Sequence, residues 1–482
     1  MIKIVGLGPG SELSLTVGTI NALKNCEDVY FRTKIHPTVD YIEKQGIKFE
    51  TYDFEYETKQ DFDSVYMSIA EDLVEKAKEK DIVYAVPGHP LVAEKSVVNL
   101  ISLCEKEHIK YEILPAVSFI DAIMESLKID PVEGLKVIDA FDMKNQIMDK
   151  RIGTIITQVY NQFIASEVKL SLLDYYNDET EIYFIRAAGI PGLESIRKIP
   201  LYELDRQEDI DYLTSVYIPK NLDNKKDIYD LVDLVEILRG ENGCPWDREQ
   251  THKSVRNALI EESYEAADAI DNEDDDAMVE ELGDVLFQVI FHAVIGHEDA
   301  YFDLSDIIDG VYNKMVYRHP HVFGDDKAKD TEEVLDKWNK LKKKEKSLNT
   351  VTDELKAVAK ALPGLTRAQK IQKKASKVGF DWDNVFGAMS KVEEELNELK
   401  EVYNGSNKAR ILDEVGDLIF ACVNVSRFLG VDSEDAVNNT CEKFIKRFQF
   451  IEEKATEKGM KLENMSLEQM DELWESAKLT EK

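Results

Sequence analysis

The sequence predicts a multidomain protein in which an N-terminal α/β half is followed by an all-α C-terminal half. The chain has 482 residues, which is more than one hydrophobic core usually accommodates. Up to about residue 220, short β-branched or aromatic runs alternate with helical stretches. After the polar segment 219–226 the strand-like runs stop, and apolar residues recur with a period near 3.6. We therefore place a domain boundary at this segment.

Seven short apolar runs are the expected strands of the first half. They cover residues 2–7, 28–31, 82–86, 111–114, 154–157, 181–185 and 215–218. Helical stretches separate most of these runs, and glycine or proline stands at most of their ends. This alternation is typical of α/β domains.

The helical half contains one acidic pattern twice. The motifs E-E-x-x-E and E-x-x-D each recur 133 residues later. Their acids are Glu261, Glu262, Glu265, Glu281 and Asp284 in the first copy, and Glu394, Glu395, Glu398, Glu414 and Asp417 in the second. A lysine-rich stretch, 340–346, separates the copies. We therefore divide the chain into a domain of residues 1–222 and two repeats, 223–350 and 351–482.

The spacing of these acids predicts a metal site. Acids three residues apart project from one face of a helix, and two antiparallel helices would bring four carboxylates together. Such a cluster needs a cation, and oxygen ligands favour Mg²⁺ or Mn²⁺. The alternative is an ordinary solvated acidic face. We favour the metal, because Asp284 and Asp417 open apolar helices that we expect to be buried, where unpaired carboxylates are costly.

Cations and tryptophans follow the acids in both repeats. They are Lys314, Arg318 and Trp338 in the first repeat, and Lys443, Arg447 and Trp474 in the second. A lysine and an arginine four residues apart on a helix can meet one triphosphate tail, and a tryptophan can stack on a base. The alternatives are salt-bridged surface residues and tryptophans that fill the bundle core. Recurrence in both repeats favours substrate contact for the cations.

Three further segments complete a family pattern: Cys244-Pro-Trp-Asp247, Arg318-His-Pro-His-Val-Phe323 and Glu442-Lys-Phe-x-x-Arg447-Phe448. With the acidic motifs, residues 225–482 resemble the all-α, MazG-type nucleoside triphosphate pyrophosphohydrolases. The resemblance implies Mg²⁺-dependent cleavage of a nucleoside triphosphate to the monophosphate and pyrophosphate, in nucleotide-pool control or house-cleaning. It implies metal ligands at Glu262, Glu265, Glu281, Asp284, Glu395, Glu398, Glu414 and Asp417. Glu261 and Glu394 are candidates for orienting the attacking water, or are exposed first-turn acids.

The resemblance also concerns assembly. A MazG-type unit works beside a second copy, which implies that the two repeats pair within one chain, as a pseudo-dimer, or across a homodimer.

Glycine- and proline-rich turns mark the first half. Gly6-Leu-Gly8-Pro-Gly10, Pro87-Gly-His-Pro90 and Pro115-Ala-Val-Ser118 each follow an expected strand. These turns resemble those of the tetrapyrrole (corrin/porphyrin) methylase family over residues 1 to about 220. The resemblance implies two α/β lobes with S-adenosylmethionine between them, contacted by Gly8, Gly88, Ala116, Ser118 and Gly189. His89 and Ala93 depart from the Asp and Gly usual in that family. The domain order resembles the bacterial YabN-type fusion proteins.

Two other functions remain open. One is an S-adenosylmethionine-dependent methyltransferase acting on a tetrapyrrole-like acceptor, with the helical half as an accessory. The other is a dimerisation scaffold in which the acids are vestigial.

Charge and hydropathy limit the partners. The chain has 60 basic and 95 acidic residues, a net charge of −35, which would repel nucleic acid and anionic lipid. No apolar stretch approaches the roughly 20 residues that cross a bilayer. The N-terminus resembles a strand rather than a secretion signal, so we expect a cytoplasmic protein.

Overall fold

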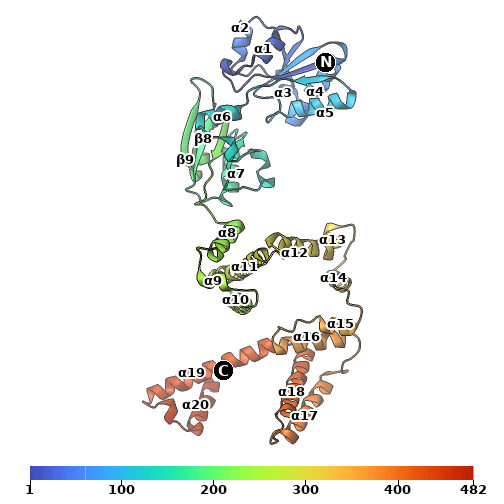
Figure 1. The fold of residues 1–482 in the computed structure, drawn as a ribbon, viewed down its shortest axis with the longest axis vertical. Coiled ribbons are helices and arrows are strands. Elements are labelled where there is room, and N and C mark those ends of the chain that lie inside the picture. Colours follow the sequence, from blue (N-terminus) through green and yellow to red (C-terminus); the bar gives the residue numbers. More distant parts are fainter. Residues whose placement is uncertain (60, 481–482) are drawn as a thin grey trace. The chain divides into compact units, whose positions relative to one another are not determined.

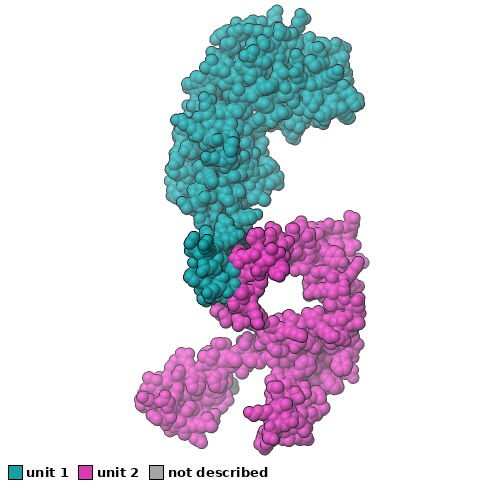
Figure 2. Space-filling view, in the orientation of Figure 1, with its two compact units in different colours: residues 1–250 teal, residues 251–482 magenta. Residues whose placement is uncertain are grey.

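The computed structural model describes residues 1–59 and 61–480. The chain forms two compact units, Met1–Gln250 and Thr251–Lys482 (Figure 2). Unit 1 contains every strand of the described residues, in two sheets, and unit 2 is helical (Figure 1). The predicted change from α/β to all-α character is therefore confirmed.

The first lobe of unit 1 is a parallel sheet with strand order β3-β2-β4-β1-β5. Its strands are β1 (Ile2–Gly6), β2 (Val29–Phe31), β3 (Glu50–Thr51), β4 (Ile82–Val86) and β5 (Tyr111–Ile113). Its helices are α1 (Val17–Lys24), α2 (Val39–Lys44), α3 (Asp53–Thr58), α4 (Phe62–Glu79) and α5 (Lys95–Glu107).

Apolar residues on both sides of the strands explain why this sheet is covered on both faces. Successive strand residues point to opposite faces. Ile4 and Tyr84 therefore pack in the cluster formed with α4 and α5, whereas Val5 and Ala85 pack in the cluster formed with α1 and α2. All five residues of β4 are buried, as expected for a central parallel strand.

The second lobe is a mixed sheet with strand order β6-β7-β10-β8-β9, in which only β6 and β7 are parallel. Its strands are β6 (Leu135–Asp139), β7 (Gly153–Thr157), β8 (Glu181–Arg186), β9 (Ser195–Pro200) and β10 (Thr214–Ile218), and its helices are α6 (Phe119–Leu127) and α7 (Gln162–Leu173). All seven predicted strands are present. The three that the sequence did not reveal, β3, β6 and β9, are edge strands.

Two helices that follow the polar segment belong to unit 1. They are α8 (Ile228–Arg239) and α9 (Pro245–Glu249). The segment before them is anchored, because buried Asn224 donates a hydrogen bond to Thr180 Oγ1 at 2.9 Å. The buried ammonium of Lys150 forms an ion pair with Asp230 at the start of α8. The proposed repeat limits, 223–350 and 351–482, remain a prediction from the sequence.

Unit 2 contains two long helical hairpins, α10/α11 and α17/α18. Its helices are α10 (Arg256–Asp271), α11 (Asp275–Glu298), α12 (Leu304–Arg318), α13 (Pro320–Phe323), α14 (Thr331–Glu345), α15 (Val351–Lys356), α16 (Gly364–Ser376), α17 (Val385–Val402), α18 (Lys408–Phe428), α19 (Ser433–Glu457) and α20 (Leu467–Thr480). A search of the described residues finds no helix that qualifies as a transmembrane segment.

The apolar helices expected after Asp284 and Asp417 are only partly buried. Ile290 and Phe291 are buried in α11, but Leu286 is 42% exposed. In α18, Ile419 is 49% and Phe420 is 43% exposed. The expectation of buried helices was therefore wrong for these positions. A two-helix hairpin covers one face of each helix and leaves the other face open.

Candidate functional site

Three glutamates converge in the first hairpin. Glu262 and Glu265 lie one turn apart on α10, and Glu281 lies on the antiparallel helix α11. One carboxylate oxygen from each lies within 4.8 Å of the others. Asp284 follows Glu281 by one turn and is not a member of this group, although its charge acts on Glu262.

Like charges perturb the first cluster. Burial, followed by the charges of Asp284 and Glu265, raises the pKa of Glu262 above its ordinary value. Burial, followed by the charge of Glu265, likewise raises the pKa of Glu281. A cation that binds between these carboxylates would relieve their repulsion. The all-oxygen donor set fits a hard divalent cation such as Mg²⁺.

The second hairpin repeats the cluster with Glu395 and Glu398 on α17 and Glu414 on α18. Glu395 is buried, with 6% of its surface exposed. The charge of Glu395, followed by burial, raises the pKa of Glu398. Asp417, one turn beyond Glu414, is outside the group of three, as Asp284 is in the first hairpin.

Two cations that our sequence analysis missed contact the second cluster. Lys391 lies 2.7 Å from Glu394 and 2.5 Å from Glu395, and Arg410 lies 3.7 Å from Glu414. The bonds to Glu394 and Glu395 raise the pKa of Lys391. A signal was present in the sequence, because both cations stand four residues before an acid of the motif.

The first hairpin lacks these cations. The 133-residue offset places Ala258 at the position of Lys391 and Ala277 at that of Arg410. The two clusters therefore share their glutamates and differ in the positive charge beside them.

The predicted cations and tryptophans form pairs in both repeats. The guanidinium of Arg318 on α12 lies 5.2 Å from the ring centroid of Trp338 on α14. That of Arg447 on α19 lies 5.5 Å from Trp474 on α20. Arg318 is buried and also donates from Nε to Glu345 at 2.8 Å. Lys314 and Lys443 lie one turn before the arginines, on α12 and α19.

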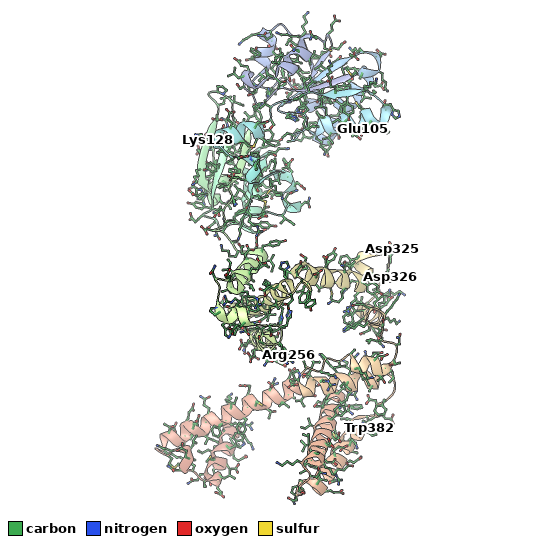
Figure 3. The ribbon with its side chains drawn as sticks, viewed as in Figure 1. Glu105, Lys128, Arg256, Asp325, Asp326 and Trp382 are labelled. Atoms are coloured by element: carbon green, nitrogen blue, oxygen red, sulfur yellow. The ribbon has the colours of Figure 1, made fainter. Side chains whose placement is uncertain are left out.

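The two candidate water-orienting acids lie beside the clusters. Glu261 and Glu394 are exposed and each precedes a cluster glutamate on α10 or α17. Glu394 accepts from Lys391, as described above. Trp382 corresponds to Trp246 of the first repeat at an offset of 136 residues, and it lies just before α17 and packs against Gly387 (Figure 3).

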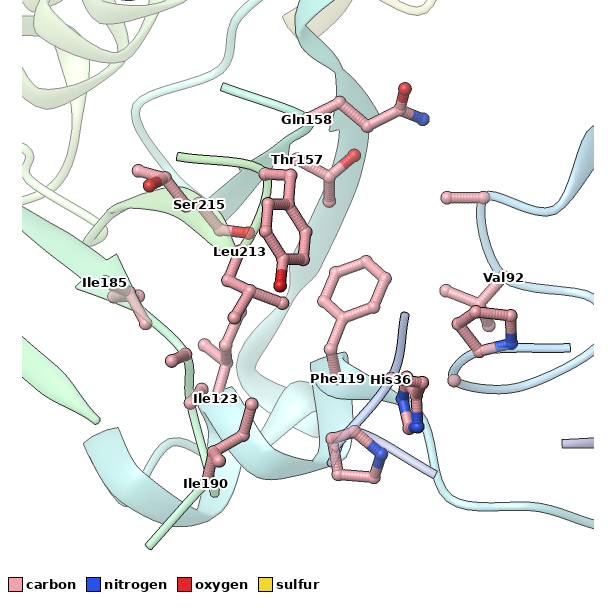
Figure 4. Close-up of a pocket in the computed structure, with 18 of the residues that line it drawn as sticks. His36, Val92, Phe119, Ile123, Thr157, Gln158, Ile185, Ile190, Leu213 and Ser215 are labelled. Carbon is pink, nitrogen blue, oxygen red and sulfur yellow. The ribbon is translucent and has the colours of Figure 1, made fainter. Parts of the chain in front are cut away.

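A cavity of about 190 Å³ lies between the two lobes of unit 1 (Figure 4). His36 and Val92 line it from the first lobe, and Phe119, Thr157 and Leu213 line it from the second. The glycine turns shape its rim, because a Cβ added at Gly6 would lie 2.2 Å from the carbonyl oxygen of Gly88. Ala93 has a φ of 53°, the left-handed conformation that glycine adopts more easily.

The backbone contacts implied for S-adenosylmethionine are largely engaged within the protein. Gly8 and Gly88 line the cavity but exchange backbone hydrogen bonds at 3.2 and 2.9 Å. The N–H of Ser118 donates to Asp121 and that of Gly189 donates to Glu194, both at 2.6 Å. Ala116, Ser118 and Gly189 are not among the residues that line the cavity.

Two protein families match this chain. The tetrapyrrole (corrin/porphyrin) methylase family matches residues 1–205. The MazG nucleotide pyrophosphohydrolase domain matches residues 250–323 and 386–449, which contain the two glutamate clusters.

Relatives match the whole chain or its helical half. The uncharacterized protein YabN of Bacillus subtilis is 45% identical over 485 residues, covering 100% of this chain and 99% of YabN. The nucleoside triphosphate pyrophosphohydrolase/pyrophosphatase MazG of Thermotoga maritima is 44% identical over 249 residues, covering 52% of this chain and 94% of the relative. The nucleoside triphosphate pyrophosphohydrolase of Escherichia coli K12 is 40% identical over 256 residues, covering 52% of this chain and 97% of the relative.

Proposed function

The chain belongs to the MazG nucleotide pyrophosphohydrolases and carries a tetrapyrrole methylase domain in front of its two MazG domains, and from this premise we propose how its residues divide the reaction. The protein is a hydrolase that converts a nucleoside triphosphate and water to the monophosphate and pyrophosphate. The observation that carries the assignment of residues is the convergence of three glutamates in each hairpin.

The glutamates would hold a divalent cation, for which we propose Mg²⁺. The first metal site would consist of Glu262, Glu265 and Glu281, with Asp284 one turn away. The second would consist of Glu395, Glu398 and Glu414, with Asp417 one turn away. A bound Mg²⁺ neutralises phosphate oxygens and makes a nearby water more acidic. Glu261 and Glu394 are proposed to orient the attacking water by accepting its hydrogen bond.

The cations and tryptophans would bind the substrate. Arg447 and Lys443, and their counterparts Arg318 and Lys314, are proposed to contact the phosphate oxygens. Trp474 and Trp338 are proposed to stack on the base, since their rings already face a guanidinium.

We propose that the second repeat turns over substrate faster than the first. Lys391 and Arg410 place positive charge beside its acids, where a triphosphate would arrive, and the first repeat has alanine at both positions. These cations would exchange their glutamate partners for phosphate oxygens when the glutamates take up the metal.

The exposed apolar residues of the hairpins support pairing of the repeats. Leu286 on α11 and Ile419 and Phe420 on α18 expose large apolar surface in unit 2. We propose that the hairpins pack against one another within a chain or across a homodimer. Such pairing would complete each site with cations from another helical element.

Product analysis with separate variants tests the assignment. Full-length protein, Glu265→Ala and Glu398→Ala would be incubated with each nucleoside triphosphate and Mg²⁺, including damaged bases. We expect the wild type to release pyrophosphate. We expect Glu398→Ala to lose more of this activity than Glu265→Ala. Equal losses would contradict the ranking of the repeats, and absence of pyrophosphate in every reaction would contradict the metal-site assignment.

For the N-terminal domain we propose that the interlobe cavity binds S-adenosylmethionine. The support is the match to the methylase family together with a cavity rimmed by the glycine turns. Calorimetry with S-adenosylhomocysteine tests this proposal. Heat of binding that disappears in Gly88→Val would support it, and no binding to the wild type would contradict it.

A further inference from the structure

An ion pair between half-buried Arg32 and buried Glu94 lies in the wall of the interlobe cavity of unit 1. Arg32 follows β2 and Glu94 follows β4, and both residues line the cavity. Nη1 of Arg32 lies 3.1 Å from Oε2 of Glu94. The two strands are neighbours in the parallel sheet, so their carboxyl ends bring both side chains to the same edge.

The two partners differ in how fully they are bonded. Glu94 is 5% exposed, and its second oxygen accepts a hydrogen bond from Ser96 Oγ at 2.6 Å. Ser96 is in turn bonded to the hydroxyl of Tyr84 at 2.7 Å. Glu94 is thus held in place at both oxygens by groups of the first lobe.

Arg32 has hydrogen-bonding capacity to spare. A guanidinium carries five N–H donors, and the contact with Glu94 engages only Nη1. Nε of Arg32 is buried and has no hydrogen-bond partner among the described residues. Buried donors without partners are rare in folded proteins, so this Nε needs an acceptor from outside the described residues, either a ligand or a water.

The rest of the cavity wall offers little other charge. Among the described lining residues, the further titratable groups are His36, Tyr160 and Tyr212. Burial, followed by the charge of Arg32, lowers the pKa of His36 to about 4, so this ring is neutral near pH 7. Apolar side chains, including Phe119, Ile123 and Ile190, complete the wall (Figure 4).

We propose that Arg32 anchors an oxyanion, a carboxylate or a phosphate, of a ligand that enters the interlobe cavity. The fork of the guanidinium suits either group, and Glu94 holds it in orientation from behind. The inference rests on the cavity being a ligand site, as proposed above. Two sources share this chemistry: the methionyl carboxylate of the methyl donor, and an anionic group of a second molecule, the acceptor.

Variants must separate loss of the anchor from loss of folding. Arg32→Gln alone would leave Glu94 buried and unpaired. The informative comparison is therefore Glu94→Gln against the double variant Arg32→Gln/Glu94→Gln, which differ only at Arg32. Arg206→Gln, at an exposed arginine of the same unit, controls for general loss of positive charge.

Calorimetry on the full chain distinguishes the sources. S-adenosylhomocysteine carries the methionyl carboxylate, whereas 5′-methylthioadenosine lacks it. If the donor is the source, the double variant binds S-adenosylhomocysteine about tenfold or more weakly than Glu94→Gln, and both bind 5′-methylthioadenosine equally. If the acceptor is the source, both nucleosides bind equally. Inorganic phosphate or malonate then stabilises Glu94→Gln against heat, but not the double variant.

The same measurements can overturn the proposal. If neither nucleoside affinity nor the stabilisation by phosphate and malonate depends on Arg32, the anchor does not exist. Failure of both nucleosides to bind the wild type would remove the proposed S-adenosylmethionine site. The phosphate and malonate titrations would then decide on Arg32 alone, so the two failures are distinguishable.

Discussion

The ammonium of Lys391 lies 2.5 Å from a carboxylate oxygen of Glu395, a ligand candidate of the second repeat. A cation in this position competes with a metal for Glu395, and it also supplies charge that can bind phosphate. The corresponding residue of the first repeat is Ala258, so the competition is confined to one of the two clusters.

Removal of this lysine should act on metal and substrate in opposite directions. In Lys391→Met we expect tighter Mg²⁺ binding without nucleotide, because the competing cation is gone. We also expect the KM for nucleoside triphosphates to rise about tenfold, because a charge-assisted hydrogen bond is lost. Calorimetry and steady-state kinetics measure the two effects. Lys400→Met, at an exposed lysine on the same helix, should change neither, and an unchanged KM in Lys391→Met would contradict the role in substrate binding.

Metal binding in the first repeat should depend on Glu281. Replacement of a residue that only orients a metal ligand already costs about 10- to 100-fold in affinity. We therefore expect Glu281→Gln to weaken Mg²⁺ binding in this repeat about tenfold or more, measured in a Glu398→Ala background that silences the other cluster. Glu280→Gln removes an adjacent charge outside the group of three. If both variants bind Mg²⁺ equally, general negative charge rather than a defined site is responsible.

The raised pKa values of Glu262 and Glu281 predict a pH dependence. A carboxyl group with a higher pKa in the folded state binds protons more tightly there. The folded state therefore loses stability as pH rises from the ordinary pKa near 4.5 through the raised value. Without metal, Glu265→Gln should melt about 2 °C above the wild type at pH 8, and the gap should close toward pH 4.5.

With Mg²⁺ at pH 8, the wild type should instead melt at a higher temperature than Glu265→Gln. The reason is that only the wild type keeps the full ligand set of the first repeat. Thermal melts in excess chelator and in excess Mg²⁺ measure both effects. Asp309→Asn removes an exposed acid of α12 and should show neither. A constant gap at all pH values would mean that the carboxylates do not interact.

Trp474 and Arg447 should affect different parts of the substrate. Stacking of a base on an aromatic ring contributes about 1–3 kcal/mol, so Trp474→Ala should raise the KM for ATP about tenfold. Inhibition of Trp474→Ala by inorganic tripolyphosphate, which has no base, should equal inhibition of the wild type. Arg447→Met should weaken the binding of both ATP and tripolyphosphate. Recovery of the KM in Trp474→Phe would support stacking, whereas equal loss of ATP and tripolyphosphate binding in Trp474→Ala would indicate a packing role against Phe444.

The ion pair between Lys150 and Asp230 should hold α8 on unit 1. Lys150 is 4% exposed and also donates to the carbonyl oxygen of Lys225 at 2.7 Å. Loss of one partner of a buried pair costs about 3–5 kcal/mol, so Asp230→Asn should expose the segment 219–230 to proteases. The bond from Lys150 lowers the pKa of Asp230, so this stabilisation should fade as pH falls below 3.8. The exposed pair Lys198–Glu181 provides a control, and Glu181→Gln should leave cleavage unchanged.

The central strands could be predicted from the sequence, whereas most of the edge strands could not. The runs at β1, β4 and β10 are apolar because helices or strands cover them on both sides, so they were visible in the sequence. The edge strand β6 carries Lys136, which donates to the carbonyl oxygen of Ile147, and β9 carries Arg197 and Lys198, which pair with acids. Their sequences resemble loops, because an edge strand needs apolar residues on fewer sides.

The glutamate clusters were predictable in part. The three-residue spacing on a helix is a property of the sequence, and it brought Glu262 together with Glu265 and Glu395 with Glu398. The approach of Glu281 and Glu414 depends on the antiparallel register of each hairpin. That register brings these glutamates, and not Asp284 or Asp417, into the group of three.

By itself, the sequence determined the order of an α/β domain and two helical repeats, and which residues carry the acids, the cations and the tryptophans. Helical and strand periodicities are local, so the order of residues is enough to predict them. Only the tertiary structure decided that Glu281 joins Glu262 and Glu265, that Arg447 faces Trp474, and that Arg32 pairs with Glu94 in the wall of the cavity. Each of these contacts depends on helix rotation, hairpin register or sheet order, which arise when separate elements pack together.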